Sequence, residues 1–91
     1  MVRKLLLPLL LAVATASAQP ADENTLFEQG NRAYAEGDYA AAREAYEQLV
    51  KSGSRNPAVF LNLGHADYRL GREVPAAINY RRALALDPAN T

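Results

Sequence analysis

Beyond residue 22, the chain shows the spacing of amphipathic helices and no segment that alternates apolar and polar residues with a period of two. Two candidate helices each carry one face at i, i+4 and i+7, and the two faces are 34 residues apart. These faces consist of Phe27, Asn31 and Tyr34 and of Leu61, His65 and Tyr68. The pattern predicts an all-α fold without strands.

Capping residues divide this region into four helices. The starts of the first three are marked by residues suited to the N-cap, namely Asp22 or Asn24, Asp38, and Asn56 followed by Pro57. Gly37 and Gly71 can adopt the left-handed conformation that ends a helix. We therefore expect the second helix over about 39–51 and the third from Pro57 to about Leu70. The fourth holds Pro75 in its first turn and ends before Asp87.

The same pattern occurs twice, because residues 23–56 align with residues 57–90 without a gap. The identical pairs are Gly30 with Gly64, Tyr34 with Tyr68, Gly37 with Gly71, Ala42 with Ala76, Tyr46 with Tyr80, and Asn56 with Asn90. The matching residues are small or aromatic, and charged positions differ, which is typical of a structural repeat. Each copy, 23–56 and 57–90, is predicted to be one helical hairpin.

Small residues at matching positions predict where the two helices of each hairpin cross. These residues are Gly30, Ala42, Gly64 and Ala76. A larger side chain at a crossing would push the helices apart. Tyr46 and Tyr80 are expected to fill the space toward the following helix.

The second copy resembles the tetratricopeptide repeat family, which repeats a helix–turn–helix unit every 34 residues. The residues that carry the resemblance are Phe60, Leu63, Gly64, Tyr68, Gly71, Ala76, Tyr80, Ala83, Leu84 and Pro88. The first copy is looser, with Gln29 where leucine is usual and Ser54 in place of the closing proline. The resemblance implies a curved stack whose first helices line a concave groove that binds proteins.

By this resemblance, the two repeated faces look into the groove. The predicted partner-binding residues are Phe27, Asn31, Tyr34, Leu61, Asn62, His65 and Tyr68. Apolar side chains would contact an extended peptide or a partner helix, and the asparagines and histidine would hydrogen-bond it. For Tyr34 and Tyr68 a place in the core is equally compatible with the pattern. A clamp for a terminal carboxylate is excluded, because Phe27 stands where such a clamp has lysine.

A second surface is predicted on the last helix. Ala77, Tyr80 and Leu84 are spaced to receive a further helix, and an apolar strip left in water is unfavourable. Self-association, docking onto a larger partner and a truncated reading frame all remain open as explanations of this strip.

Residues 1–18 have the features of a cleaved signal peptide. A short basic start precedes the apolar run "LLLPLLLAVA", and Ala16 and Ala18 have the spacing that a signal peptidase recognises. The run is too short to span a bilayer and Pro8 interrupts it. We expect cleavage after Ala18 and a periplasmic or secreted bacterial protein with no stable membrane insertion. The leader and the two repeats together resemble the N-terminal part of the repeat protein of bacterial aerotolerance (Bat) operons, which implies an assembly partner in the cell envelope.

Composition excludes several function classes. Ten basic residues balance ten acidic ones, which argues against nucleic-acid binding, and the chain contains no cysteine. His65 is the only histidine, and neither a metal site nor a nucleophile with its base can be assembled around it. The sequence therefore predicts no enzyme, cofactor or metal. It predicts a protein-interaction module, or alternatively a structural fragment that associates with itself and binds no peptide.

Overall fold

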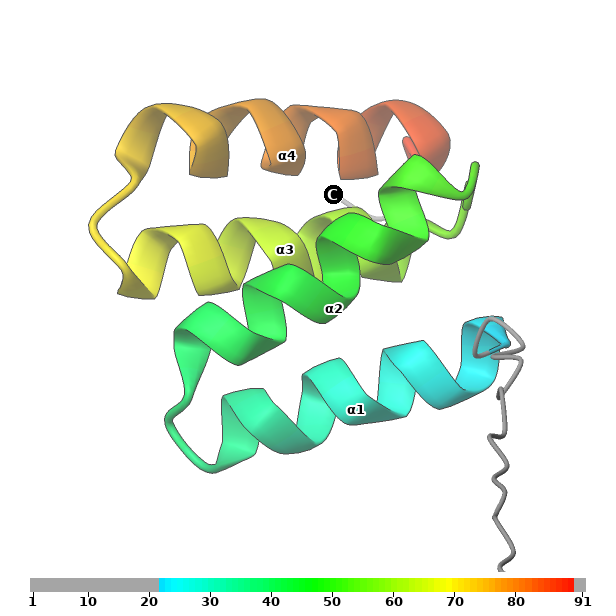
Figure 1. Ribbon diagram of the computed structural model, residues 1–91. Coiled ribbons are helices and arrows are strands. Elements are labelled where there is room, and N and C mark those ends of the chain that lie inside the picture. Colours follow the sequence, from blue (N-terminus) through cyan, green and yellow to red (C-terminus); the bar gives the residue numbers. More distant parts are fainter. Residues whose placement is uncertain (1–21, 90–91) are drawn as a thin grey trace, which may run out of the picture.

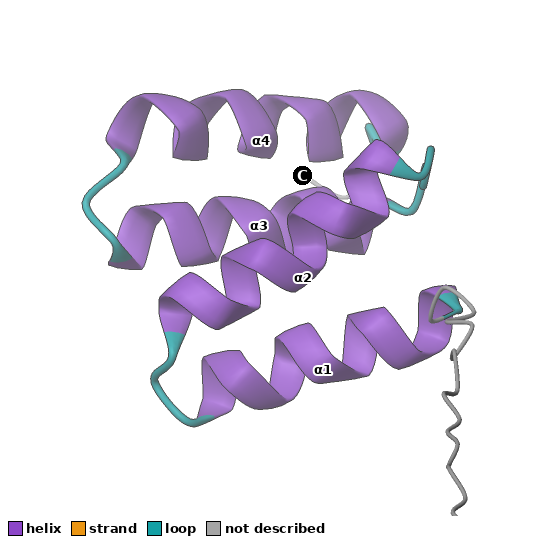
Figure 2. Cartoon of the chain, in the orientation of Figure 1, coloured by secondary structure: helices purple, strands orange, loops and turns teal. Residues whose placement is uncertain are grey.

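The computed structural model describes residues 22–89, which form four helices in two hairpins (Figure 1). The helices are α1 (Glu23–Ala35), α2 (Tyr39–Lys51), α3 (Pro57–Arg69) and α4 (Glu73–Leu86). The described residues contain helices and connecting turns but no strand, as Figure 2 shows. The all-α expectation is confirmed. The signal-peptide prediction for residues 1–18 lies outside the described residues.

The helix boundaries follow from local capping chemistry. The side chain of Asp22 accepts a hydrogen bond from the Thr25 N–H at 2.8 Å, and Asp38 accepts one from Ala41 at 3.1 Å. Asn56 caps α3 in the same way, with Pro57 as the first helical residue. Only α4 lacks a side-chain cap at its start. The predicted caps are confirmed, with Asp22 rather than Asn24 as the cap of α1.

One glycine in each hairpin makes the sharp turn between its two helices possible. Gly37 follows α1 with φ of 82°, and Gly71 follows α3 with φ of 79°. Residues with a side chain rarely adopt this left-handed conformation, so glycine ends both helices at low cost. The turns return α2 onto α1 and α4 onto α3, and α3 packs against α2 to join the hairpins (Figure 1).

The core lies where α2 and α3 meet. Its buried residues are Ala42, Tyr46, Leu49, Val59, Leu63 and Ala66. Leu26, Phe27, Ala33, Tyr34 and Val50 pack against this cluster from its edges. The first hairpin therefore has an apolar cover from α3, whereas the second hairpin has no following helix among the described residues.

A glycine–tyrosine contact closes each hairpin. A Cβ atom on Gly30 would lie 2.5 Å from Cε1 of Tyr46, and a Cβ on Gly64 would lie 2.6 Å from Cε1 of Tyr80. Each ring thus lies over the glycine of the preceding helix in its own hairpin. Tyr46 also lies in the buried core with Val59 and Leu63 of α3, which agrees with the expectation that it fills the space toward the following helix. For Tyr80 no following helix is described, so the same expectation stays a prediction. The glycine, by lacking a side chain, opens the space that the ring occupies.

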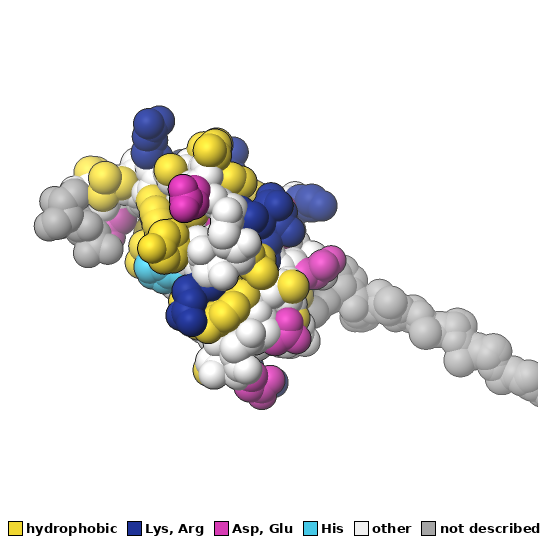
Figure 3. Space-filling model, turned by 90° about the vertical axis from the view of Figure 1, so that its left-hand side faces the viewer, with side chains coloured by type: hydrophobic (Ala, Val, Ile, Leu, Met, Phe, Trp, Pro, Cys, Tyr) yellow, Lys and Arg dark blue, Asp and Glu magenta, His cyan; other side chains and the backbone are white. Residues whose placement is uncertain are grey.

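No helix within residues 22–89 is long and apolar enough to cross a membrane. On the face shown in Figure 3, acidic and basic side chains are interspersed with hydrophobic ones.

Candidate functional site

Residues from α1, α2 and α3 surround a small hollow on the surface, which we call the polar hollow. It has a volume of about 110 Å³ and is lined by Asn31, Tyr34, Tyr46, Asn62 and His65. Four of these five belong to the predicted groove set. The sequence placed them on two separate helices, and the contact of α1 with α3 brings them together.

Hydrogen bonds hold the amides of the polar hollow in fixed positions. The Tyr46 hydroxyl donates to Oδ1 of Asn31 at 2.6 Å, and Nδ2 of Asn62 donates to the same oxygen at 3.2 Å. Within residues 22–89, the remaining amide groups, Nδ2 of Asn31 and Oδ1 of Asn62, make no hydrogen bond to protein atoms. The two amides of the hollow therefore leave one N–H donor group and one carbonyl acceptor for a ligand.

The second hairpin repeats this arrangement with a different partner. Nδ1 of His65 lies 3.0 Å from the Tyr80 hydroxyl, and His65 and Tyr80 occupy the same repeat positions as Asn31 and Tyr46. Burial raises the pKa of both tyrosine hydroxyls above their ordinary value, so at neutral pH each keeps its proton. When the imidazole is neutral, a hydroxyl that donates to Nδ1 leaves the proton of His65 on Nε2.

The polar hollow offers neutral hydrogen-bonding groups of amides, phenol rings and one imidazole. None of the residues that line the polar hollow is a carboxylate or carries a permanent charge. Asp67 is two residues from His65 but is buried on the opposite side of α3. Within the described part of the chain, no group of three or more His, Asp or Glu side chains is placed to hold a metal ion.

Two of the three remaining groove residues, Phe27 and Leu61, lie elsewhere in the structure. Phe27 packs against the core, with its ring centre 6.2 Å from that of Tyr46. Leu61 occupies the equivalent position in the second repeat but lines a different hollow, beside Tyr80 and Leu84. The structure therefore does not place Phe27 and Leu61 at the polar hollow.

The alternatives left open for the repeated tyrosines are resolved differently in the two repeats. Tyr34 packs at the edge of the core and against Tyr39, at 5.0 Å between ring centres. Tyr68, at the equivalent position, is 61% exposed. Two differences between the repeats go with this: α3 covers the first hairpin whereas no described element covers the second, and Glu73 stands where the first repeat has Tyr39.

The strip predicted on α4 is partly exposed. Ala77 is exposed, Tyr80 is half-buried, and 45% of Leu84 is accessible. Together with Leu61 these residues form what we call the end face. Their apolar surface remains available in the described part of the chain.

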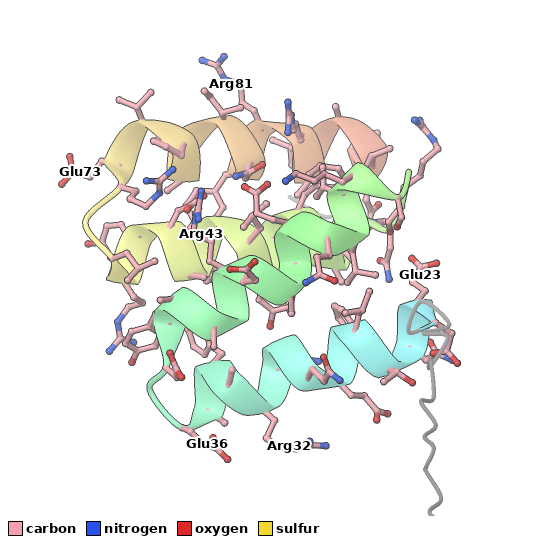
Figure 4. All side chains as sticks on the ribbon, in the orientation of Figure 1. Glu23, Arg32, Glu36, Arg43, Glu73 and Arg81 are labelled. Atoms are coloured by element: carbon pink, nitrogen blue, oxygen red, sulfur yellow. The ribbon has the colours of Figure 1, made fainter. Side chains whose placement is uncertain are left out.

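One buried carboxylate was not identified from the sequence. Asp67 is 1% exposed, and its Oδ1 accepts hydrogen bonds from Nε of Arg43 at 3.0 Å and from Nε of Arg72 at 3.1 Å. Its Oδ2 accepts from Asn79 Nδ2 at 3.0 Å. Arg43 points from α2 toward α3 and α4 (Figure 4). Asp67 thus joins α2, α3 and α4. The sequence feature that could have indicated this link is a charged residue on the apolar side of α3.

Replacing Asp67 with alanine is expected to lower the free energy of unfolding by about 2 kcal/mol, because buried Asn79 loses its acceptor and two charge-assisted bonds are lost. The matched variant Glu47→Ala removes the more exposed partner of the same arginine, 3.6 Å from Arg43, and should cost less than about 0.5 kcal/mol. Urea unfolding measures both values. Equal losses would show that Asp67 is not a structural link.

Comparison with known protein families supports this architecture. The pattern of the family described as tetratricopeptide repeat matches residues 27–91. A search of curated proteins finds no match.

Proposed function

Because the chain belongs to the tetratricopeptide repeat family, whose repeats are non-enzymatic protein-interaction modules, we propose that it binds an extended segment of a partner protein at the polar hollow. The observation that carries the proposal is the pair of unused amide groups there, Nδ2 of Asn31 and Oδ1 of Asn62. A peptide unit offers one N–H and one C=O, and this pair can bind both.

The surroundings of the pair favour a backbone ligand over a charged side chain. The hollow is lined by amides, tyrosine rings and the His65 imidazole, with no carboxylate or guanidinium. The rings of Tyr34 and Tyr46 supply apolar contact beside the polar groups. Recognition would thus depend on main-chain hydrogen bonds, with neighbouring side chains setting specificity. Binding of this kind depends weakly on salt.

We also propose that this binding takes place in the bacterial cell envelope. The features of residues 1–18 support export to the bacterial cell envelope. The resemblance of the leader and the two repeats to the Bat-operon repeat protein supports an envelope assembly partner. Detection of the chain, shortened after Ala18, in a periplasmic extract would test the export step.

Replacing Asn62 with alanine is expected to weaken peptide binding about tenfold, because the acceptor is lost together with the bond that orients Asn31. The probe is the tightest peptide that the full chain selects from a random-sequence phage library, measured by calorimetry. Asn62 is half-buried, and its amide bonds Asn31 and also acts on the Tyr46 hydroxyl. Tyr46 and Asn31 keep their direct hydrogen bond to each other without Asn62, so the fold should persist.

The matched control is Asn24→Ala, which makes the same change at an exposed position of α1 outside the hollow. It should leave the dissociation constant unchanged. Equal affinity of the wild-type chain and Asn62→Ala for the selected peptide would refute the polar hollow as the binding site.

A further inference from the structure

The first repeat shows what kind of structure fits the end face. A shift of 34 residues places Tyr46 on Tyr80 and Val50 on Leu84. In the first repeat, α3 covers this surface through Val59, Leu63 and Ala66, all three within the buried core. The equivalent surface of the second repeat contains a hollow of about 210 Å³, lined in part by Leu61, Tyr80, Leu84 and Asp87. Its shape therefore suits a helix that packs as α3 does.

The end of this surface at the C-terminus of α4 is acidic, unlike the C-terminal ends of α1, α2 and α3. The last turns of α1, α2 and α3 each contain a basic residue, namely Arg32, Lys51 and Arg69. The last turn of α4 has none, and its C-cap is Asp87. A helix C-terminus carries partial negative charge, so an acidic cap adds to a charge that cations normally offset. A helix that packs as α3 packs on α2 would begin here, with its positive end beside Asp87.

The other end of the surface is also acidic. Glu73 occupies the position that Tyr39 has in the first repeat. There the guanidinium of Arg69, in the last turn of α3, lies 4.5 Å from the centre of the Tyr39 ring. Glu73 is exposed, points away from the helices in Figure 4, and makes no ion pair within residues 22–89. A basic residue in the last turn of a covering helix would pair with it.

A second copy of the chain is a poor occupant. The residues of α1 that would have to act as Val59, Leu63 and Ala66 are Thr25, Gln29 and Arg32, and all three are exposed and polar. Head-to-tail stacking would therefore bury polar groups against apolar ones. Two end faces related by a twofold axis that sets the α4 helices antiparallel would place Glu73 near Asp87 of the other copy, and like charges repel.

We propose that the end face binds an amphipathic helix of a partner protein, with aliphatic residues at i, i+4 and i+7 and a basic residue at i+10. The helix packs its apolar stripe on Leu61, Tyr80 and Leu84. Its N-terminal turn lies at Asp87, and its basic residue pairs with Glu73. This interaction is separate from peptide binding at the polar hollow.

The test uses two synthetic helical peptides that differ at one position. Both carry valine, leucine and alanine at i, i+4 and i+7, and position i+10 is arginine in one and glutamate in the other. Fluorescence anisotropy with the full chain should show that the arginine peptide binds about fivefold more tightly. Glu73→Lys should reverse this preference, because Glu73 is exposed and its replacement leaves the packing intact.

Two further variants separate this site from the polar hollow. Leu84→Asn should weaken binding of both peptides roughly tenfold, whereas Asn62→Ala should leave both unchanged. Circular dichroism verifies the helix content of each variant. Equal binding of the two peptides, an unchanged preference in Glu73→Lys, or a dimer that light scattering detects and that Leu84→Asn dissociates would each overturn the proposal.

Discussion

Replacement of Gly64 by leucine is expected to abolish cooperative folding of the chain. Even a Cβ atom at this position would lie 2.6 Å and 2.7 Å from atoms of the Tyr80 ring and 3.3 Å from the carbonyl oxygen of Ala76. The ring can turn away only by leaving its site, and the backbone of α4 cannot move without separating the hairpin. Overpacking costs about 1–3 kcal/mol or more, which is a large part of what a domain of this size has. A thermal melt followed by circular dichroism should lose its cooperative transition.

Two comparisons make this result specific to the glycine–tyrosine contact. Gln48→Leu introduces the same side chain at an exposed position in the last turn of α2 and should leave the melt unchanged. The milder Gly64→Ala should destabilise the wild-type chain but have less effect in a Tyr80→Ala background, where the ring is absent. Additive effects of the two substitutions would show that the contact does not hold α3 and α4 together.

Tyr46→Ala is expected to lower the free energy of unfolding by about 3–5 kcal/mol, the range for loss of a large buried aromatic side chain. The ring is 1% exposed, lies over Gly30 and donates a hydrogen bond to Asn31. Removal would leave a cavity in the core between α1, α2 and α3. Urea unfolding with linear extrapolation measures the loss.

Tyr80→Ala is the matched control, because it makes the same change at the same repeat position. Tyr80 is only half-buried, since no described helix covers it. The cost should therefore be clearly smaller than at Tyr46. A loss at Tyr80 as large as that at Tyr46 would contradict the conclusion that α3 completes the core of the first hairpin and that no described helix does so for the second.

The helices and their ends could be predicted from the sequence because they depend on local chemistry. The cap residues Asp38 and Asn56, the first-turn proline at 57 and the left-handed Gly37 act within a few residues of their own position. The crossing point of each hairpin could also be predicted, because glycine recurs at a fixed repeat position.

Contacts between helices that are distant in sequence were harder to predict. The direction of the Tyr46 ring depends on the space that Gly30 leaves, and helical periodicity does not specify it. Phe27 and Tyr34 pack against the core, whereas the residues at the same repeat positions, Leu61 and Tyr68, do not. This difference depends on whether another helix covers the position. The structural role of Asp67 could not be predicted, because a single carboxylate on an apolar face does not indicate which arginines from other segments will bond it.

The recurring bond between a tyrosine hydroxyl and the residue after the glycine has a consequence for how such proteins can diversify. Gly30 and Tyr46 match Gly64 and Tyr80, yet the hydroxyl meets an amide at Asn31 and an imidazole at His65. Packing requires the glycine and the ring, whereas the hydroxyl can form its hydrogen bond with either an amide or an imidazole. New ligand preferences can therefore arise by substitution at this one position, repeat by repeat, without a new scaffold.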